Sequence, residues 1–217
     1  QADQIMAVSH FKGHGMSGLG GIMKNLGMGC ASRAGKLMQH YNVEPEVNTE
    51  ECIACGECAK WCPEDAIEVG EYAVIDREKC IGCGECRIVC PVDAIEVEDT
   101  SSNKELQEKI AEYAFGALKD KEDKAVHFNF IMDVTPECDC PPWRKAPMVP
   151  DIGVVASKDP VALEQASFDL VKEEEGRDYD EGEDKFKAEH DIDGTHQIKH
   201  AEKMGLGERE YELIDIS

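Results

Sequence analysis

The chain has 217 residues, 41% of them hydrophobic, which is enough for one sizeable domain with an insertion or for two domains. Its formal net charge of −23 argues against binding to nucleic acid or to anionic membrane surfaces, which require patches of Lys and Arg. The charge favours positively charged redox partners, and the alternative is that it serves solubility alone. No stretch of about 18 apolar residues is present, so we expect no membrane-spanning segment.

The first predicted element is a short buried strand at residues 5–9, followed by a glycine-rich loop at 10–18. Helices are predicted at 19–26 and 34–40, with a break at 27–30 between them. The chain begins with Gln1 and enters a strand almost at once. We therefore expect that upstream sequence precedes it in the natural protein.

The next segment carries two copies of the run C-x-x-C-x-x-C-x-x-x-C-P. Their ligand positions are Cys52, Cys55, Cys58 and Cys62, then Cys80, Cys83, Cys86 and Cys90. This spacing is typical of two 4Fe–4S clusters, where the fourth cysteine of each run ligates the other cluster. The predicted ligands are Cys52, Cys55, Cys58 and Cys90 for one cluster, and Cys80, Cys83, Cys86 and Cys62 for the other. Zinc is the alternative, but zinc sites use two cysteine pairs rather than three cysteines plus one before a proline.

The repeat extends beyond the cysteines. Gly56 recurs as Gly84, and the segment 65–69 (DAIEV) recurs as 93–97. Such self-similarity indicates two copies of one structural unit. The two glycines allow the backbone to turn close to sulfur. Short strands are predicted near 67–69, 73–75 and 95–97.

The chain then continues with a predicted helix at 103–118, strands at 125–134 and 151–156, and a helix with Asp159 as N-cap and Pro160 in its first turn. Residues 173–189 are acidic and predicted to be a solvated, mobile segment. A helix at 195–204 and a strand at 211–216 complete the predicted elements.

Alternating strands and helices indicate an α/β fold, an open sheet with flanking helices. The predicted α/β domain comprises residues 1–45 and 99–217. An inserted ferredoxin-like (α+β) two-cluster module at 46–98 interrupts it, and the ends of this module, near Glu46 and Glu98, should lie close together.

Three cysteines remain: Cys30, Cys138 and Cys140. The segment Cys138–Cys140, like the loop that begins at His10, follows a predicted strand. Ligand sites in open α/β sheets collect at the carboxyl ends of strands, so these two loops are expected to face one another. The candidate catalytic residues are His10, Lys12, His14, Cys138 and Cys140. Cys30, Cys138 and Cys140 are candidates for an extra metal site; the alternative is that they are buried apolar side chains or free thiols.

The glycine-rich run at 13–29 is a candidate anion cradle at a helix start, although it lacks the spacing of a Walker loop or a dinucleotide fingerprint. The basic residues nearby are Lys12, Lys24 and Lys36. A close-packed glycine turn is the alternative. His196 and His200 could share a helix face, with exposed polar roles as the alternative, and Asp133 lies at a strand end.

Several segments resemble a prokaryotic family known as domain of unknown function 362. They are HFKGH at 10–14, KNLGMGCASRAGK at 24–36, DCP at 139–141, PDIG at 150–153, SKDPVA at 157–162 and LGEREYEL at 206–213. The resemblance implies an iron–sulfur protein of undefined reaction, here with a ferredoxin insert. It also implies a longer chain with an α/β segment before the His10 loop, so this chain is expected to be the C-terminal part.

The expected function is electron transfer by two 4Fe–4S clusters, with a redox partner protein, in the reducing cytosol of an organism that avoids oxygen. One alternative is an oxidoreductase, or a subunit of one, whose clusters feed a site in the α/β domain. Its residues would be His10, Lys12, His14, Cys30, Cys138 and Cys140. Another is a maturation or scaffold protein that hands over a metal or cluster.

Overall fold

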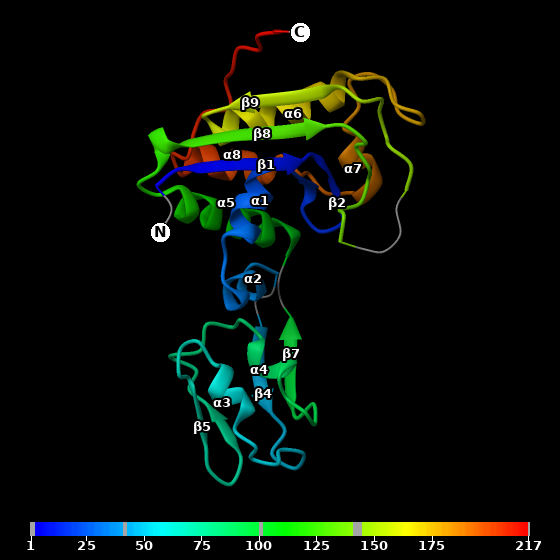
Figure 1. Cartoon of the computed structure of the whole chain (residues 1–217). Coiled ribbons are helices and arrows are strands. Elements are labelled where there is room, and N and C mark those ends of the chain that lie inside the picture. Colours follow the sequence, from blue (N-terminus) through cyan, green and yellow to red (C-terminus); the bar gives the residue numbers. More distant parts are fainter. Residues whose placement is uncertain (1–2, 41–42, 100–101, 141–144, 217) are drawn as a thin grey trace. The chain divides into compact units, whose positions relative to one another are not determined.

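The computed structural model describes residues 3–40, 43–99, 102–140 and 145–216. It divides into two compact units, coloured along the sequence in Figure 1. Unit 1 comprises Gln1–Cys30 and Asn103–Ser217, and unit 2 comprises Ala31–Ser102. Unit 2 is therefore an insertion between the two parts of unit 1. Among the described residues, no helix is long and apolar enough to cross a membrane.

Unit 1 is built on a three-stranded sheet in the order β1-β8-β9. The strands are β1 (Ile5–His10), β8 (Ala125–Ile131) and β9 (Gly153–Ser157). β1 runs parallel to β8, with Ile5 opposite Ala125 and His10 opposite Phe130, whereas β9 is antiparallel to β8. A separate small hairpin pairs β2 (Lys12–His14) with β3 (Gly18–Gly20). The chain is thus a mixed α/β protein with small sheets and flanking helices.

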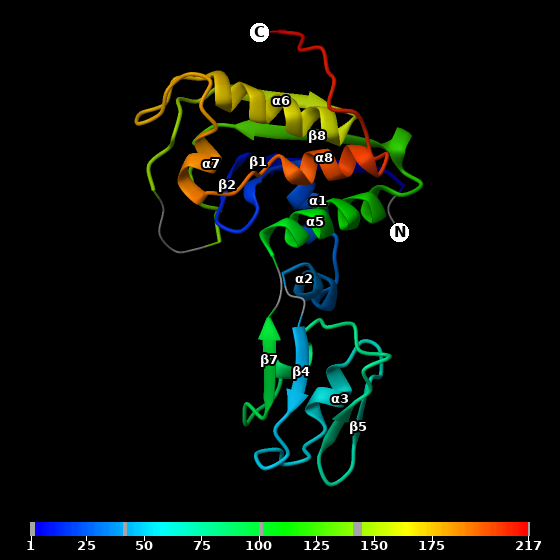
Figure 2. The same cartoon turned by 180° about the vertical axis from the view of Figure 1, so that it is seen from behind.

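Helices of unit 1 lie on one side of this sheet, as Figures 1 and 2 show. They are α1 (Ile22–Gly29), α5 (Asn103–Leu118), α6 (Pro160–Glu173) and α8 (His196–Lys203). The side chains of each strand alternate accordingly. Ala7 and Ser9 of β1 are buried under the helices, whereas Met6 on the opposite face is 71% exposed and Val8 is 52% exposed.

The start of α6 was predictable because its sequence carries a capping signal. The Asp159 side chain accepts hydrogen bonds from the backbone N–H groups of Val161 (2.8 Å) and Ala162 (3.0 Å), and Pro160 occupies the first turn. The predicted helices α5 and α6 are both confirmed, and α5 has the bounds that the sequence predicts.

The predicted break at 27–30 was wrong, because α1 continues through Gly27 and Gly29. A Cβ atom on Gly27 would lie 2.4 Å from the carbonyl oxygen of Ile110. Glycine is therefore present because α1 and α5 approach closely, and not because the helix ends there. The predicted loop at 10–18 likewise contains β2 and the first residue of β3.

The acidic segment 173–189 was predicted to be mobile and solvated, but it contains part of helix α7 (Lys185–His190). Lys185 is only 1% exposed, and its ammonium donates to the carbonyl oxygens of Lys172 (2.9 Å) and Asp180 (3.2 Å). These bonds tie the segment to the end of α6. The predicted last strand at 211–216 is not formed within the described residues.

Within its described residues, unit 2 contains two antiparallel strand pairs and three short helices. β4 (Val43–Val47) pairs with β7 (Ile95–Asp99), and β5 (Ile67–Val69) pairs with β6 (Ala73–Ile75). The helices are α2 (Arg33–His40), α3 (Glu57–Trp61) and α4 (Glu85–Ile88). Because Glu44 lies opposite Glu98 and Glu46 opposite Glu96, the first and last strands of the cysteine-rich segment are neighbours.

Unit 2 begins earlier in the chain than the expected insertion boundary at residue 46. Arg33 of α2 explains the difference, since its guanidinium lies 2.9 Å from the Glu85 carboxylate and 5.1 Å from the ring centre of Trp61. The ion pair and the cation–π contact attach α2 to the cysteine-rich segment.

Candidate functional site

Two cavities in unit 2 are each lined by four cysteines. The first cavity contains Cys52, Cys55, Cys58 and Cys90, and the second contains Cys62, Cys80, Cys83 and Cys86. Their empty volumes, openings to solvent included, are about 340 and 350 Å³. Each set combines three cysteines of one run with the last cysteine of the other run, which is the crossed grouping that the spacing predicts.

The sequence repeat is reproduced in the backbone around the cysteines. Gly56 and Gly84 precede α3 and α4 with φ values of 78° and 73°, in the left-handed region that glycine tolerates. The backbone N–H of Ala66 donates to Cys62 Sγ at 3.3 Å, and the equivalent N–H of Ala94 donates to Cys90 Sγ at the same distance. The last cysteine of each run is therefore oriented by the same local hydrogen bond.

Burial disfavours the ionised form of several of these thiols. It raises the pKa of Cys58 and Cys83, and it raises the pKa of Cys86 to about 12. Iron ligation requires thiolates, and a bound metal centre supplies the positive charge that stabilises them. The four thiols and the apolar and glycine wall of the first cavity fit a cluster held by cysteine, with Ile95 and Ala73 among the wall residues.

The two cavities differ in one charged side chain. Glu85 lines the second cavity, is 2% exposed and forms the ion pair with Arg33. Its repeat equivalent, Glu57, is partly exposed and lies 3.4 Å from the ammonium of Lys60 on the same helix. A buried carboxylate interacts with a neighbouring charge more strongly than a solvated one, so the two cavities differ electrostatically.

No three His, Cys, Asp or Glu side chains come together to hold a metal ion within the described residues, the eight cavity cysteines included. A single zinc ion draws its thiolates to about 2.3 Å from one point, whereas a 4Fe–4S cluster spreads its four ligands over the corners of a cube. Cys30, Cys138 and Cys140 likewise form no such group within the described residues, and Cys30 is exposed at the end of α1.

A polar cleft lies in unit 1, where β1 ends and α1 begins, with an empty volume of about 630 Å³ that includes its opening. Its lining residues are Val8, Ser9, His10, Lys12, Gly20, Gly21, Lys24, Asn25, Met28, Gly29 and Asp139. The Asp139 carboxylate oxygen Oδ2 lies 3.1 Å from His10 Nδ1 and 3.4 Å from Lys12 Nζ. The loop after β1 and the loop after β8 therefore face one another, as predicted.

Hydrogen bonds on both sides of the imidazole hold His10. Its Nε2 lies 2.9 Å from the carbonyl oxygen of Met132, and its Nδ1 faces the Asp139 carboxylate. Hydrogen-bond acceptors, a carbonyl oxygen and a carboxylate, therefore face both ring nitrogens of His10. The His10 interactions with Asp139, and those of Lys12, hold the pKa of Asp139 below its usual value although burial opposes them.

Cys138 and Cys140 lie close to this cleft. The pKa of Cys140 is raised, first by a hydrogen bond with Cys138 and then by burial, while the charges of Lys24 and Lys12 oppose the rise. Cys138 is partly buried and Cys140 is exposed. Pro141 and Pro142, which follow in the sequence, lie outside the described residues.

Other candidate residues have structural roles. His14 is buried, and its Nδ1 accepts a hydrogen bond from the backbone N–H of Ser17 (3.1 Å), which stabilises the β2–β3 turn. His196 and His200 connect α8 to α5 through Glu108 (2.9 Å) and Glu112 (3.4 Å). The centroids of the two imidazole rings are 6.3 Å apart, so the predicted shared helix face is confirmed.

Two further candidates lie outside the cleft lining. The backbone N–H of Asp133 donates to the Asp151 carboxylate (2.7 Å), and Lys36 belongs to unit 2. Of the candidate catalytic residues, His10 and Lys12 therefore line the cleft, and Cys138 and Cys140 lie near it.

The anion cradle predicted at the start of α1 is occupied by a side chain of the protein. The backbone N–H of Ile22 donates to Glu164 Oε2 at 2.8 Å, and Asn129 Nδ2 donates to the same oxygen at 3.1 Å. Glu164 is fully buried, and burial raises its pKa to about 7. Sequence reasoning missed it, although it lies on the apolar stripe of α6, three residues after Val161 and four before Phe168, where a carboxylate is unusual.

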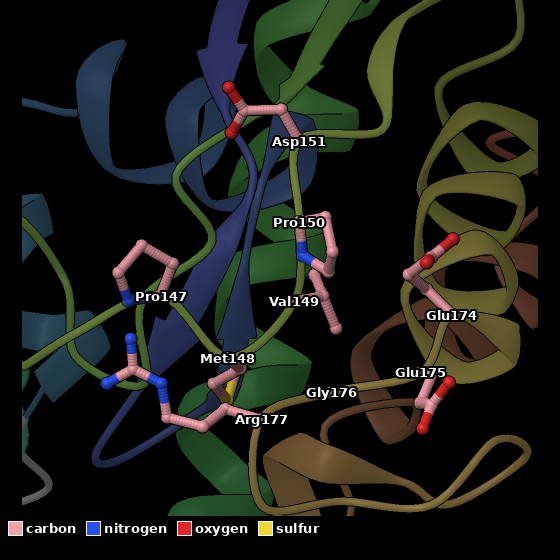
Figure 3. A pocket seen from close by; sticks show the side chains of 9 residues that line it. All are labelled: Pro147, Met148, Val149, Pro150, Asp151, Glu174, Glu175, Gly176 and Arg177. Carbon is pink, nitrogen blue, oxygen red and sulfur yellow. The ribbon is translucent and has the colours of Figure 1, made fainter.

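An open groove at the surface of unit 1 is shown in Figure 3. It runs between residues 147–151 and residues 174–177, with an empty volume of about 930 Å³ that includes open solvent. Asp151, Glu174 and Glu175 contribute acidic groups and Arg177 one basic group. None of the candidate cysteines or histidines lines it, so it carries no catalytic interpretation.

The fold and site define a mixed α/β protein with a cysteine-rich insertion. Residues 1–169 match the family model described as Domain of unknown function (DUF362), and the chain belongs to this family. A comparison with curated proteins finds no match.

Proposed function

We propose that unit 2 binds two 4Fe–4S clusters and that the protein transfers electrons. The observation that carries the proposal is the grouping of eight cysteines into two cavities of nearly equal volume, in the crossed combination. The first cavity would use Cys52, Cys55, Cys58 and Cys90, and the second Cys62, Cys80, Cys83 and Cys86. Each bound cluster supplies a one-electron redox centre.

Groups of the protein would adjust how readily each cluster is reduced. The N–H groups of Ala66 and Ala94, which donate to sulfur, lower the electron density on the thiolates and so favour the reduced state. The buried charge of Glu85 acts in the opposite direction in the second cavity. With a formal net charge of −23, the protein suits a redox partner with a basic docking surface.

Anaerobic iron and sulfide analysis of the full chain tests this proposal. We expect about eight irons and eight sulfides per chain, as two 4Fe–4S clusters require. A Cys138→Ala/Cys140→Ala variant is the matched control, because it removes two cysteines that lie outside both cavities, and it should hold the same iron. Stoichiometric zinc in protein produced with sufficient iron, or iron without sulfide, contradicts the proposal.

An oxidoreductase is the second candidate function, and the polar cleft favours it. A carrier needs little more than the cysteine-rich segment, whereas unit 1 brings His10, Lys12 and Asp139 into contact from two loops far apart in the sequence. A metal that is stoichiometric in the wild type and lost from the Cys138→Ala/Cys140→Ala variant would favour this function. Transfer of iron from the protein to an apo acceptor would instead favour the scaffold alternative.

A further inference from the structure

The polar cleft of unit 1 concentrates positive charge in an acidic protein. Lys12 and Lys24 both line it, and Asp139 is the carboxylate among the lining residues that the structure describes. The formal net charge of the chain is −23, so two ammonium groups beside one carboxylate are a local exception. A cleft that carries positive charge attracts anions and raises their local concentration.

The two ammonium groups differ in the hydrogen-bond partners that the protein gives them. Lys12 donates to the carbonyl oxygen of His10 (2.9 Å) and faces Asp139 at 3.4 Å, which leaves one of its three hydrogens available. Lys24 is partly buried and makes no hydrogen bond or ion pair with the described residues. A partly buried ammonium that lacks a hydrogen-bond partner is unfavourable unless a ligand supplies one.

Lys24 also lies near another positive charge. Burial lowers the pKa of Lys24, and the charge of Lys12 adds to this effect, while Cys138, Cys140 and Asp139 oppose it. An anion placed between the two ammonium groups would neutralise their repulsion and use their unoccupied donors.

The helix start does not contribute to this site. The first N–H of α1 already donates to the buried Glu164, so recognition there depends on side chains. Because ammonium groups are point charges with rotatable donors, they suit an oxyanion without imposing the planar two-point geometry of arginine.

We propose that the cleft binds a small oxyanion, the carboxylate or phosphate group of a soluble molecule, between the ammonium groups of Lys24 and Lys12. His10 and Asp139 act as positioning residues, because their contact and the Lys12–Asp139 pair hold Lys12 at the cleft. This site lies wholly in unit 1, so the proposal is independent of cluster binding in unit 2.

Calorimetric titration of the full chain tests the proposal, with inorganic phosphate and succinate as separate probes at low ionic strength. We expect saturable binding of at least one probe to the wild type. Lys24→Gln should weaken that binding at least tenfold, and Lys24→Arg should retain most of it because the charge is kept. The control is Lys158→Gln, which removes an exposed lysine of the same unit and should bind as the wild type does.

The two probes distinguish the source of the oxyanion. Preference for phosphate indicates a phosphorylated ligand, and preference for succinate indicates a carboxylate ligand; both support the site. Failure of both probes to bind, or equal binding by wild type and Lys24→Gln, overturns it. The iron content of the same preparations, measured separately, shows whether the cluster proposal stands or fails independently.

Discussion

Glu164 provides a test of the energetics of unit 1. Its side chain is fully buried, with Oε2 bonded to Ile22 N and Asn129 Nδ2, and Oε1 buried without a hydrogen-bond partner among the described residues. Burial raises the pKa of the carboxyl from 4.5 to about 7 despite these hydrogen bonds. At about 1.36 kcal/mol per pKa unit, the rise corresponds to about 3 kcal/mol between the protonation states.

The sign of the pH dependence follows from the raised pKa. Below pH 4.5 the carboxyl is protonated in both folded and unfolded states, and burial of a charge costs nothing. Between pH 4.5 and about 7 the unfolded chain loses the proton while the folded chain keeps it, so this group lowers stability as pH rises. Above about pH 7 the folded state carries a buried charge, and the full cost of about 3 kcal/mol is present.

The Glu164→Gln variant removes this titration and keeps an oxygen that can accept the hydrogen bond from Ile22. Its unfolding free energy relative to the wild type should therefore increase by up to about 3 kcal/mol between pH 4.5 and pH 7.5. Urea unfolding followed by far-ultraviolet circular dichroism under anaerobic conditions measures this difference. Glu173→Gln, which changes an exposed carboxylate of the same helix, is the matched control. A difference between wild type and Glu164→Gln that stays constant with pH refutes the reasoning.

Two further predictions concern the loop that carries the cleft and the second cavity. Gly13→Ala should destabilise unit 1 by about 1–3 kcal/mol or more, because the new Cβ would lie 1.8 Å from the carbonyl oxygen of Pro136. Gly15→Ala is the control in the same thermal unfolding assay and should be tolerated, because its Cβ would point into open space. Glu85→Gln should raise the midpoint potential of the cluster in the second cavity by on the order of 50 mV in a spectroscopic redox titration, whereas Glu57→Gln should change the potentials less. Equal shifts in these two variants would count against an electrostatic role for Glu85.

Local signals explain which parts of the fold could be predicted. Asp159 and Pro160 mark the start of α6 through bonds made within three residues, and the backbone does form them. The cysteine spacing similarly determines local loop geometry, which recurs in both copies as positive φ at Gly56 and Gly84. The lining of the two cavities agrees with the crossed assignment, and cluster binding itself stays a prediction.

Features that depend on long-range packing could not be predicted in this way. The sequence around Gly27 predicted a helix break, but the helix continues there, and Gly27 lies against Ile110, a residue distant in the sequence. Lys185 lies in an acidic run and becomes buried because its ammonium bonds to backbone carbonyls that only the folded chain presents. The occupation of the α1 start by Glu164 also joins residues more than a hundred positions apart.

Within the cleft, sequence reasoning selected His10 and Lys12 from their position after a strand, and the structure places both there. It also selected His14, which has the same local signal but points into the β2–β3 turn. Strand ends indicate a region of the fold, whereas the direction of each side chain depends on the hairpin that follows. Asp139 was part of a noted motif, but its contacts required the two loops to be brought together.

The most direct test of the proposed function compares four single-cysteine variants by iron content and by electron paramagnetic resonance of the reduced protein. Cys55→Ser and Cys90→Ser should each keep about four irons and show the same residual spectrum, because both alter the first cavity. Cys62→Ser and Cys83→Ser should share the other spectrum. A wild-type chain that binds no iron and sulfide, or a Cys90→Ser spectrum that matches Cys83→Ser instead of Cys55→Ser, would contradict the account.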